Sequence, residues 1–282
     1  MIGRAHRWLR DSDPLLLVLR SSLVALLVNS NDDPVVMGAV GVTCLVALPR
    51  PRLLTAPWLW GALCLAIGAR QLLGWHQVDD HIIVTTYWCG AIALGLSSAR
   101  PRENLAAAAR LLIGSVFAFA VAWKIGSGEF ADGSFFRHTL LFDERFETVA
   151  RVVGGTSADV HRANLVAAEQ ALGRNDPTPI FLGEGPRNML VATIFTWWGI
   201  VIEAAVALSF LLPVRRRWEW VRTAALLAFA TTTYLIVPVG GFGTLLLVLC
   251  AAQVGDDRTR IALMWGGAGL LLWAGIWPTV FL

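Results

Sequence analysis

The feature of this sequence that most constrains its fold is a repeated alternation of apolar segments and connecting loops. A helix needs roughly 20 apolar residues to cross the hydrocarbon core of a bilayer. Nine segments are candidates for such helices, although the second and the eighth are short enough to be tilted, kinked or re-entrant. The candidates are 14–30, 34–49, 53–73, 82–98, 104–125, 189–213, 219–236, 239–254 and 261–281.

The composition agrees with a membrane protein. Only 15% of the residues are charged, whereas soluble domains carry about 25%. The net charge of +3 is too small to indicate nucleic-acid binding. We therefore expect one all-α integral membrane domain over residues 1–282, a polytopic bundle of about eight or nine transmembrane helices with the lipid bilayer as its main partner.

The distribution of arginine predicts how this bundle is oriented. Loops on one side are rich in arginine, and the short loops 31–33, 74–81 and 238–241 contain neither arginine nor lysine. Positive charge in short loops marks the cytoplasmic face, so the sequence predicts a multi-pass plasma-membrane protein with a cytoplasmic N-terminus. The arginines of the cytoplasmic loops are Arg4, Arg7, Arg10, Arg50, Arg52, Arg100, Arg102, Arg215, Arg216, Arg217, Arg222, Arg258 and Arg260.

The segment 126–188 is the one long loop, and this orientation places it outside the cell. Long segments between helices are usually functional or disordered. Here Ser157 and Gly173 have the positions of a helix N-cap and C-cap, and an apolar stripe is suited to lie on the membrane surface. We expect a structured cap with interfacial helices. The stripe consists of Phe135, Phe136, Leu140, Leu141, Phe142 and Phe146.

Ionisable residues within the apolar segments are candidates for function, because each costs at least ~2.5–3.5 kcal/mol at the bilayer centre. They are Arg20, Arg70, Lys124 and Glu203. Glu203 is the one acid deep in a segment, and either a structural ion pair or a role in proton movement or ligand binding fits it. Arg20 is its candidate partner by depth. Lys124 is the only lysine in the chain. It either reaches the membrane boundary with its amine or acts as a base, since a desolvated lysine can lose its proton and arginine cannot.

Polar residues also gather in the loop 75–81, before the fourth segment. Asp79 and Asp80 could cap the following helix, and His81 could belong to a site. A metal site is less favoured, because the five-residue spacing of His76 and His81 does not place both on one helical face. We predict no metal.

Several of these residues resemble the HTTM domain, the integral-membrane part of vitamin K-dependent gamma-carboxylases and their bacterial relatives. The similarity lies mainly in Ala122-Trp123-Lys124-Ile125, followed by Gly133-Ser-Phe-Phe-Arg137-His138-Thr-Leu-Leu-Phe142. Asp79-Asp80-His81 resembles a second motif of this family, an Asn-Asn-His-like sequence at the start of a helix. Arg20 and the segment from Glu203 to Arg217 also match the family pattern.

The resemblance implies a quinone-linked enzyme that modifies a peptide or a small substrate. In the carboxylases the lysine that matches Lys124 deprotonates a reduced vitamin K hydroquinone, and the histidine that matches His81 lies near the quinone. Lys124 and His81 are therefore the implied catalytic residues, with a reduced membrane quinone as cofactor. The implied quinone- or substrate-binding residues are Asp80, Trp123, Arg137, His138, Glu203 and Arg20.

Two departures qualify what the resemblance implies. The family usually has a histidine where this chain has Thr231-Thr232-Thr233. The carboxylases also continue into a large extramembrane domain, whereas this chain is nearer in size to short bacterial relatives that act in the maturation of secreted peptide toxins with a soluble partner protein. A non-enzymatic membrane partner for a secreted peptide is the alternative. A transporter is less favoured, because paired acidic sites and inverted repeats are not apparent.

Overall fold

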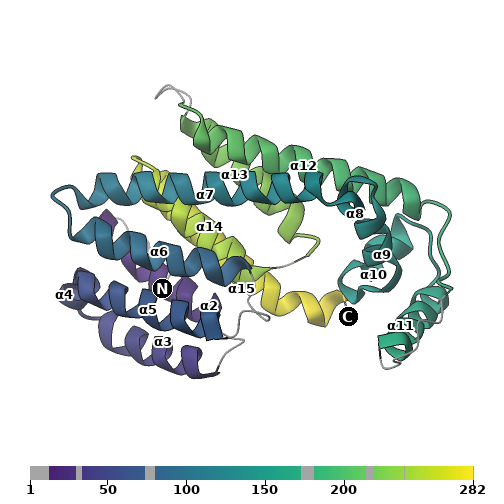
Figure 1. Ribbon diagram of the computed structural model, residues 1–282, viewed down its shortest axis with the longest axis horizontal. Coiled ribbons are helices and arrows are strands. Elements are labelled where there is room, and N and C mark those ends of the chain that lie inside the picture. The colour runs from purple at the N-terminus through teal and green to yellow at the C-terminus, as the bar shows by residue number, and fades with distance from the viewer. Residues whose placement is uncertain are drawn as a thin grey trace. The chain divides into compact units, whose positions relative to one another are not determined.

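A computed structural model of the chain (Figure 1) describes residues 13–29, 34–73, 80–172, 181–213, 219–237 and 239–281. Within these ranges, the side chains of 80–82, 172 and 277–281 are not described. Every regular element in the described ranges is a helix. The prediction of an all-α chain is therefore confirmed.

A helix occupies each of the nine apolar segments. Several of these helices begin at proline, which suits the first helical position because its missing N–H would have no partner there. Pro51 likewise begins the short helix α4 (Pro51–Leu54). The nine helices are α2 (Pro14–Asn29), α3 (Pro34–Ala47), α5 (Pro57–Leu73), α6 (Asp80–Leu96), α7 (Pro101–Gly126), α12 (Asn188–Leu211), α13 (Glu219–Tyr234), α14 (Gly240–Gln253) and α15 (Asp257–Phe281).

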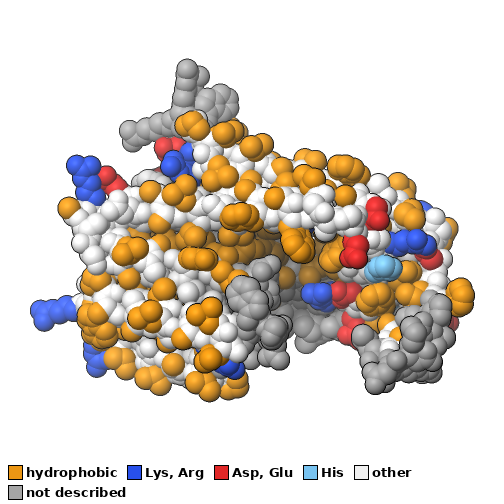
Figure 2. Space-filling model, viewed as in Figure 1, with side chains coloured by type: hydrophobic (Ala, Val, Ile, Leu, Met, Phe, Trp, Pro, Cys, Tyr) orange, Lys and Arg blue, Asp and Glu red, His pale blue; other side chains and the backbone are white. Residues whose placement is uncertain are grey.

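Three of these helices are long and apolar enough to cross a membrane when only the described residues are considered. They are α7, α12 and the part of α15 from Asp257 to Ile276. Four shorter helices are also apolar, namely α2, α3, α14 and the part of α6 from Ile83 to Leu96. Hydrophobic side chains cover much of the face shown in Figure 2, as expected for helices that contact lipid. The number of crossings stays a prediction.

The chain forms two compact units, and the first is built around α14. Every residue from Gly243 to Ala251 is buried, because the sequence of this helix is apolar on all sides. Gly241 lets α2 approach closely, since a Cβ atom there would lie 2.8 Å from Asn29 Oδ1. The Asn29 amide also donates to the Gly241 carbonyl at 3.0 Å. In the same unit, Trp88 Nε1 of α6 donates to the Ser22 hydroxyl of α2 at 2.9 Å.

The second unit contains the end of α7 from Phe117, most of α12, helix α13 and the loop segment 126–188. The described part of this loop is largely helical, which agrees with the prediction of a structured segment. Ser157 accepts a hydrogen bond from the Val160 amide at 3.3 Å, as an N-cap does. Gly173 lies outside the described residues. The helices of the loop are α8 (Gly128–Ala131), α9 (Ser134–Phe142), the 3-10 helix η2 (Glu144–Phe146), α10 (Glu147–Val152) and α11 (Ala158–Leu172).

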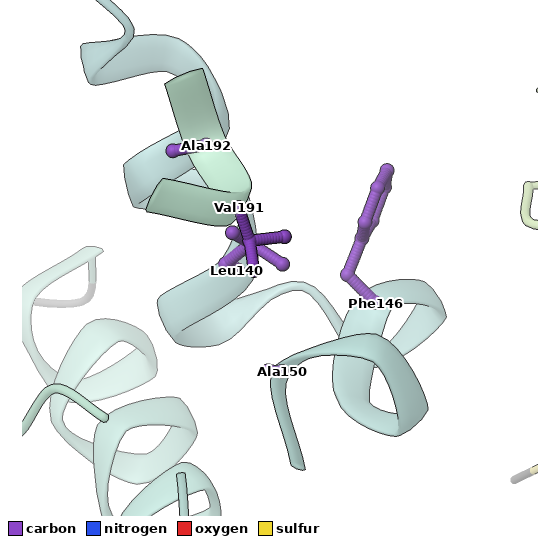
Figure 3. Packing of buried hydrophobic residues seen from close by; sticks show 5 residues of the cluster. All are labelled: Leu140, Phe146, Ala150, Val191 and Ala192. Carbon is purple, nitrogen blue, oxygen red and sulfur yellow. The ribbon is translucent and has the colours of Figure 1, made fainter. Parts of the chain in front are cut away.

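The apolar stripe of this segment is divided between the protein interior and the surface. Leu140 and Phe146 join a buried cluster with the first turns of α12 (Figure 3). Phe135 and Phe142 remain exposed. The helices of the loop segment are thus anchored on α12, and part of the predicted stripe is buried rather than exposed. The cluster consists of Leu140, Phe146, Ala150, Val191 and Ala192.

Candidate functional site

The candidate site is centred on Lys124, in the last turn of α7. Its ammonium group donates a hydrogen bond to Glu203 Oε1, and the two side chains form an ion pair. The Lys124 side chain is 19% exposed and that of Glu203 is 11% exposed. Two opposite charges are therefore largely removed from solvent, which is favourable only when each compensates the other.

An aromatic group adjoins the lysine. Lys124 Nζ lies 4.9 Å from the centroid of the Phe130 ring, a distance at which the ring face attracts a cation. Gly133, with φ of 83°, allows the chain to turn between α8 and α9, and Phe130 and Phe135 stack at 5.2 Å. Phe136 of the same group packs edge-on against Phe195 of α12 at 5.6 Å. The lysine is thus covered by apolar groups on the side of α8.

Helices α12 and α13 run antiparallel beside this pair. Trp198 Nε1 donates to the Thr232 hydroxyl at 3.2 Å, and Arg222 Nε donates to the Ser209 carbonyl at 2.9 Å. Residue numbers therefore rise along α12 as they fall along α13. This register places Glu203 beside the middle of α13.

The two faces of α12 differ in character. Thr196, Gly199 and Glu203 have the i, i+3, i+7 spacing of a single helical face, and both Thr196 and Glu203 are buried. Neither Thr196 Oγ1 nor Glu203 Oε2 has a hydrogen-bond partner among the described residues. The other side of the helix carries exposed apolar residues suited to lipid, which are Leu190, Ile194, Trp197, Trp198, Val201 and Leu208.

The partner of Glu203 differs from the one that sequence reasoning favoured. Arg20 was the candidate by depth, but the ion pair that the structure gives to Glu203 is with Lys124. Arg20 Nε donates to the Leu48 carbonyl at 3.4 Å, a contact between α2 and the end of α3. Glu203 thus forms an ion pair, with a different partner from the one predicted, and its role in proton movement or ligand binding stays a prediction.

The remaining predicted residues have varied surroundings. Helix α6 begins at Asp80. The capping role stays a prediction, because Asp79 and the side chains of Asp80 and His81 lie outside the described residues. Trp123 is 77% exposed, and His138 is exposed on α9. Trp123 neighbours Lys124 in sequence, but its side chain is exposed whereas the pair is largely buried.

Arg137 forms an ion pair with Glu184 within the segment 126–188. Its guanidinium makes a bidentate hydrogen bond with Glu184, with distances of 3.1 Å from Nε and 2.7 Å from Nη2 to Oε2. This contact raises the pKa of Arg137 through the hydrogen bond and the charge of Glu184. The bridge joins α9 to the chain that leads into α12. Arg137 therefore holds the segment together.

Two buried polar residues of α11 were not found by sequence reasoning. The Asn164 amide donates to the Leu141 and Gly183 carbonyls at 3.1 and 2.8 Å, and its oxygen accepts from the Gly183 amide at 2.8 Å. His161 is 1% exposed, and its Nε2 has no partner among the described residues. Burial lowers the pKa of His161, against the opposing charge of Glu147. Neither residue belongs to a motif that would mark it.

No metal centre is apparent in the described ranges. No three His, Cys, Asp or Glu side chains there are grouped closely enough to hold an ion. The cysteines are free thiols, and Cys44, Cys89 and Cys250 are buried. Among described residues, the ion pair of Lys124 and Glu203 is therefore the arrangement best suited to chemistry.

Comparison with known proteins adds no family or fold assignment. No protein-family model, curated protein or solved structure matches the chain. The argument for function accordingly rests on the residues of this chain.

Proposed function

We propose that this chain is a multi-pass protein of the plasma membrane, with its N-terminus in the cytoplasm, and that it binds a reduced membrane quinone at the Lys124–Glu203 pair. In this proposal it is an HTTM-type enzyme that modifies a peptide or a small substrate from the outer side, where a soluble partner protein can also bind. The observation that carries the proposal is the buried ion pair, in which Glu203 Oε2 has no partner among the described residues.

The position of Glu203 along α12 supports a site within the hydrocarbon core. The helix rises about 1.5 Å per residue, so Glu203 lies about 12 Å from the end of the helix at Leu211 and about 22 Å from its start at Asn188. The first turns of α12 pack on the loop segment 126–188, and Lys124 lies two residues before the end of α7, so the site lies toward the outer side of a core of about 30 Å. Trp197 and Trp198 lie nearer the outer boundary, where aromatic side chains are common. An apolar ligand could reach such a site from the lipid.

The donor and acceptor pattern of the pair assigns the roles in the proposal. In the ion pair Lys124 is an ammonium, and an ammonium has no lone pair to accept a proton. Glu203 Oε2 is the available acceptor. The carboxylate therefore takes the proton of a quinol hydroxyl, and the resulting ligand oxyanion has the Lys124 ammonium as its counter-charge. This assignment differs from the sequence-based prediction, in which Lys124 itself is the base.

Spectroscopy of a bound quinol tests this proposal without knowledge of the substrate. The probe is menadiol under argon, added to the protein in lipid nanodiscs. We expect the absorbance of the deprotonated quinol with the wild-type protein and its loss with Glu203→Gln and Lys124→Ala. Glu169→Gln, on the exposed face of α11, is the control. A wild-type spectrum identical to that of menadiol in empty nanodiscs would contradict the proposal.

A further inference from the structure

A second unpartnered polar group lies near the ion pair. The Tyr234 side chain, at the end of α13, is 3% exposed, and its hydroxyl has no partner among the described residues. The hydrogen bonds between α12 and α13 place it at the level of the α12 turns that precede Glu203. Buried hydroxyl groups are normally hydrogen-bonded. The Tyr234 hydroxyl and Glu203 Oε2 are thus two buried polar groups in the same part of the second unit, and neither has a hydrogen-bond partner among the described residues.

The helix directions bring these two side chains toward each other. The contacts from Trp198 to Thr232 and from Ser209 to Arg222 place Tyr234 about two turns beyond Glu203, toward the start of α12. Side chains in a helix lean toward its N-terminus. Because α12 and α13 are antiparallel, Glu203 leans toward Tyr234 and Tyr234 leans toward Glu203.

Gly199 lies on the same face of α12 as Glu203, at a level between Glu203 and Tyr234 of α13. It precedes Glu203 by one helical turn, which is the level at which the two side chains converge. A Cβ atom at Gly199 would meet only Phe130 Cζ, at 4.0 Å. The absence of a side chain at this position therefore leaves space beside an aromatic ring.

We propose that Glu203 Oε2 and the Tyr234 hydroxyl together bind a hydroxyl group of an apolar aromatic ligand. This inference rests on the proposed function and assigns the specificity of that site. The carboxylate accepts a hydrogen bond from the ligand hydroxyl, and the same ligand oxygen accepts one from Tyr234. A methyl ether or a quinone carbonyl cannot donate to Glu203, so the site selects the reduced ligand over its oxidised or alkylated forms. Tyr234 is then a binding residue that determines specificity.

The test compares 1-naphthol with its methyl ether, 1-methoxynaphthalene, by titration into nanodisc-embedded protein with empty nanodiscs as reference. A buried hydrogen bond to a charged group changes affinity by roughly tenfold or more. We expect the wild-type protein to bind 1-naphthol at least about tenfold more tightly than the ether. Tyr234→Phe should weaken binding of both probes, because an ether oxygen also accepts a hydrogen bond from the tyrosine. Glu203→Leu should remove most of the preference, because it removes the acceptor for the ligand hydroxyl.

The chain contains a matched control, because its only other tyrosine is the exposed Tyr87. Tyr87→Phe should leave both affinities unchanged. Gly199→Leu should abolish binding of both probes, whereas Ala205→Leu, on the exposed side of α12, should not. The glycine variant therefore tests the site independently if Tyr234→Phe fails to fold.

The possible results separate this inference from the proposed function. Equal affinities of the wild-type protein for both probes, or unchanged affinities in Tyr234→Phe, would overturn the hydroxyl-binding role and indicate that only water joins the two groups. If Lys124→Ala still weakened binding in that case, the proposed quinol site would stand. Absence of binding by either probe would overturn both proposals.

Discussion

Lys124 and Glu203 lie 79 residues apart in the sequence and form one buried ion pair between α7 and α12. Removal of one partner leaves an uncompensated charge, which typically costs about 3–5 kcal/mol. We expect Lys124→Met and Glu203→Leu each to lower the unfolding temperature in detergent. The double variant should recover most of the loss, because an apolar pair has no charge to compensate. Additive losses in the double variant would show that the two charges do not depend on each other.

The roles within the pair can be separated by two substitutions. If Glu203 receives the proton and Lys124 supplies positive charge, Lys124→Arg should retain part of the quinolate signal, since arginine keeps its charge. Glu203→Gln should abolish the signal. If Lys124 is the base, as the sequence alone predicted, Lys124→Arg should be as inactive as Lys124→Ala. The absorbance of menadiol under argon distinguishes these outcomes.

Asn164 should be important for the stability of the helical segment 126–188. Asn164→Leu keeps the size of the side chain but leaves the Gly183 amide and the Leu141 carbonyl without these partners. Each buried group left unsatisfied costs about 1–3 kcal/mol. We expect faster hydrogen exchange in α9 and α11, measured by mass spectrometry. Asn104→Leu removes an exposed hydrogen bond to Ser98 and should have little effect.

Docking of α11 should weaken at acidic pH because His161 is buried in its neutral form. The pKa of His161 is lowered by burial, so below about 6.5 the unfolded or undocked state binds more protons. The contribution of neutral His161 to the stability of docked α11 is therefore fully present above that pH. It is lost as the pH drops toward the lowered pKa. The charged groups facing the ring are Glu147, Arg151, Asp143 and Glu144.

Hydrogen exchange of α11 at pH 7.5 and pH 5.0 tests this dependence. Wild-type protection should decrease at the lower pH after correction for the intrinsic exchange rate. In His161→Phe the decrease should be smaller, since phenylalanine cannot titrate. An equal decrease in both proteins would assign the effect to the neighbouring acids, of which Asp143 has a lowered pKa despite burial because Arg145 bonds to it.

Arg137 provides a test of a predicted binding residue. Its bridge to Glu184 is largely exposed, at 44% and 25% for the two side chains, and such pairs contribute about 0–1 kcal/mol. We expect Arg137→Ala to change the unfolding temperature only slightly and to leave quinol binding intact. Loss of menadiol binding in a protein of normal stability would instead support the binding role that the family resemblance implies.

The positions of the helices could be predicted because apolar segments, prolines and arginine-rich loops are local features. Lys124 could also be identified, since it is the only lysine and ends an apolar segment. Its partner could not, because α7 and α12 are brought together by tertiary packing that leaves no local pattern. Expected depth alone suggested Arg20, and depth does not say which residues of different helices meet.

Two further features of the fold depend on contacts between distant residues. The apolar stripe around Leu140 was expected to face a membrane, but part of it packs on the first turns of α12, and periodicity does not say which apolar surface covers it. Tyr234 was overlooked because a single tyrosine in an apolar helix is usually a packing residue. Only the direction of its side chain relative to Glu203 gives it a role.

The end of α7 at Gly126, two residues after Lys124, has an electrostatic consequence for the site. The last carbonyl groups of a helix carry the negative end of its macrodipole, equivalent to roughly half an electron charge. Lys124 lies in this last turn, so its ammonium has a second, permanent source of negative potential. When Glu203 takes up a proton and becomes neutral, the backbone of α7 continues to stabilise the charged lysine.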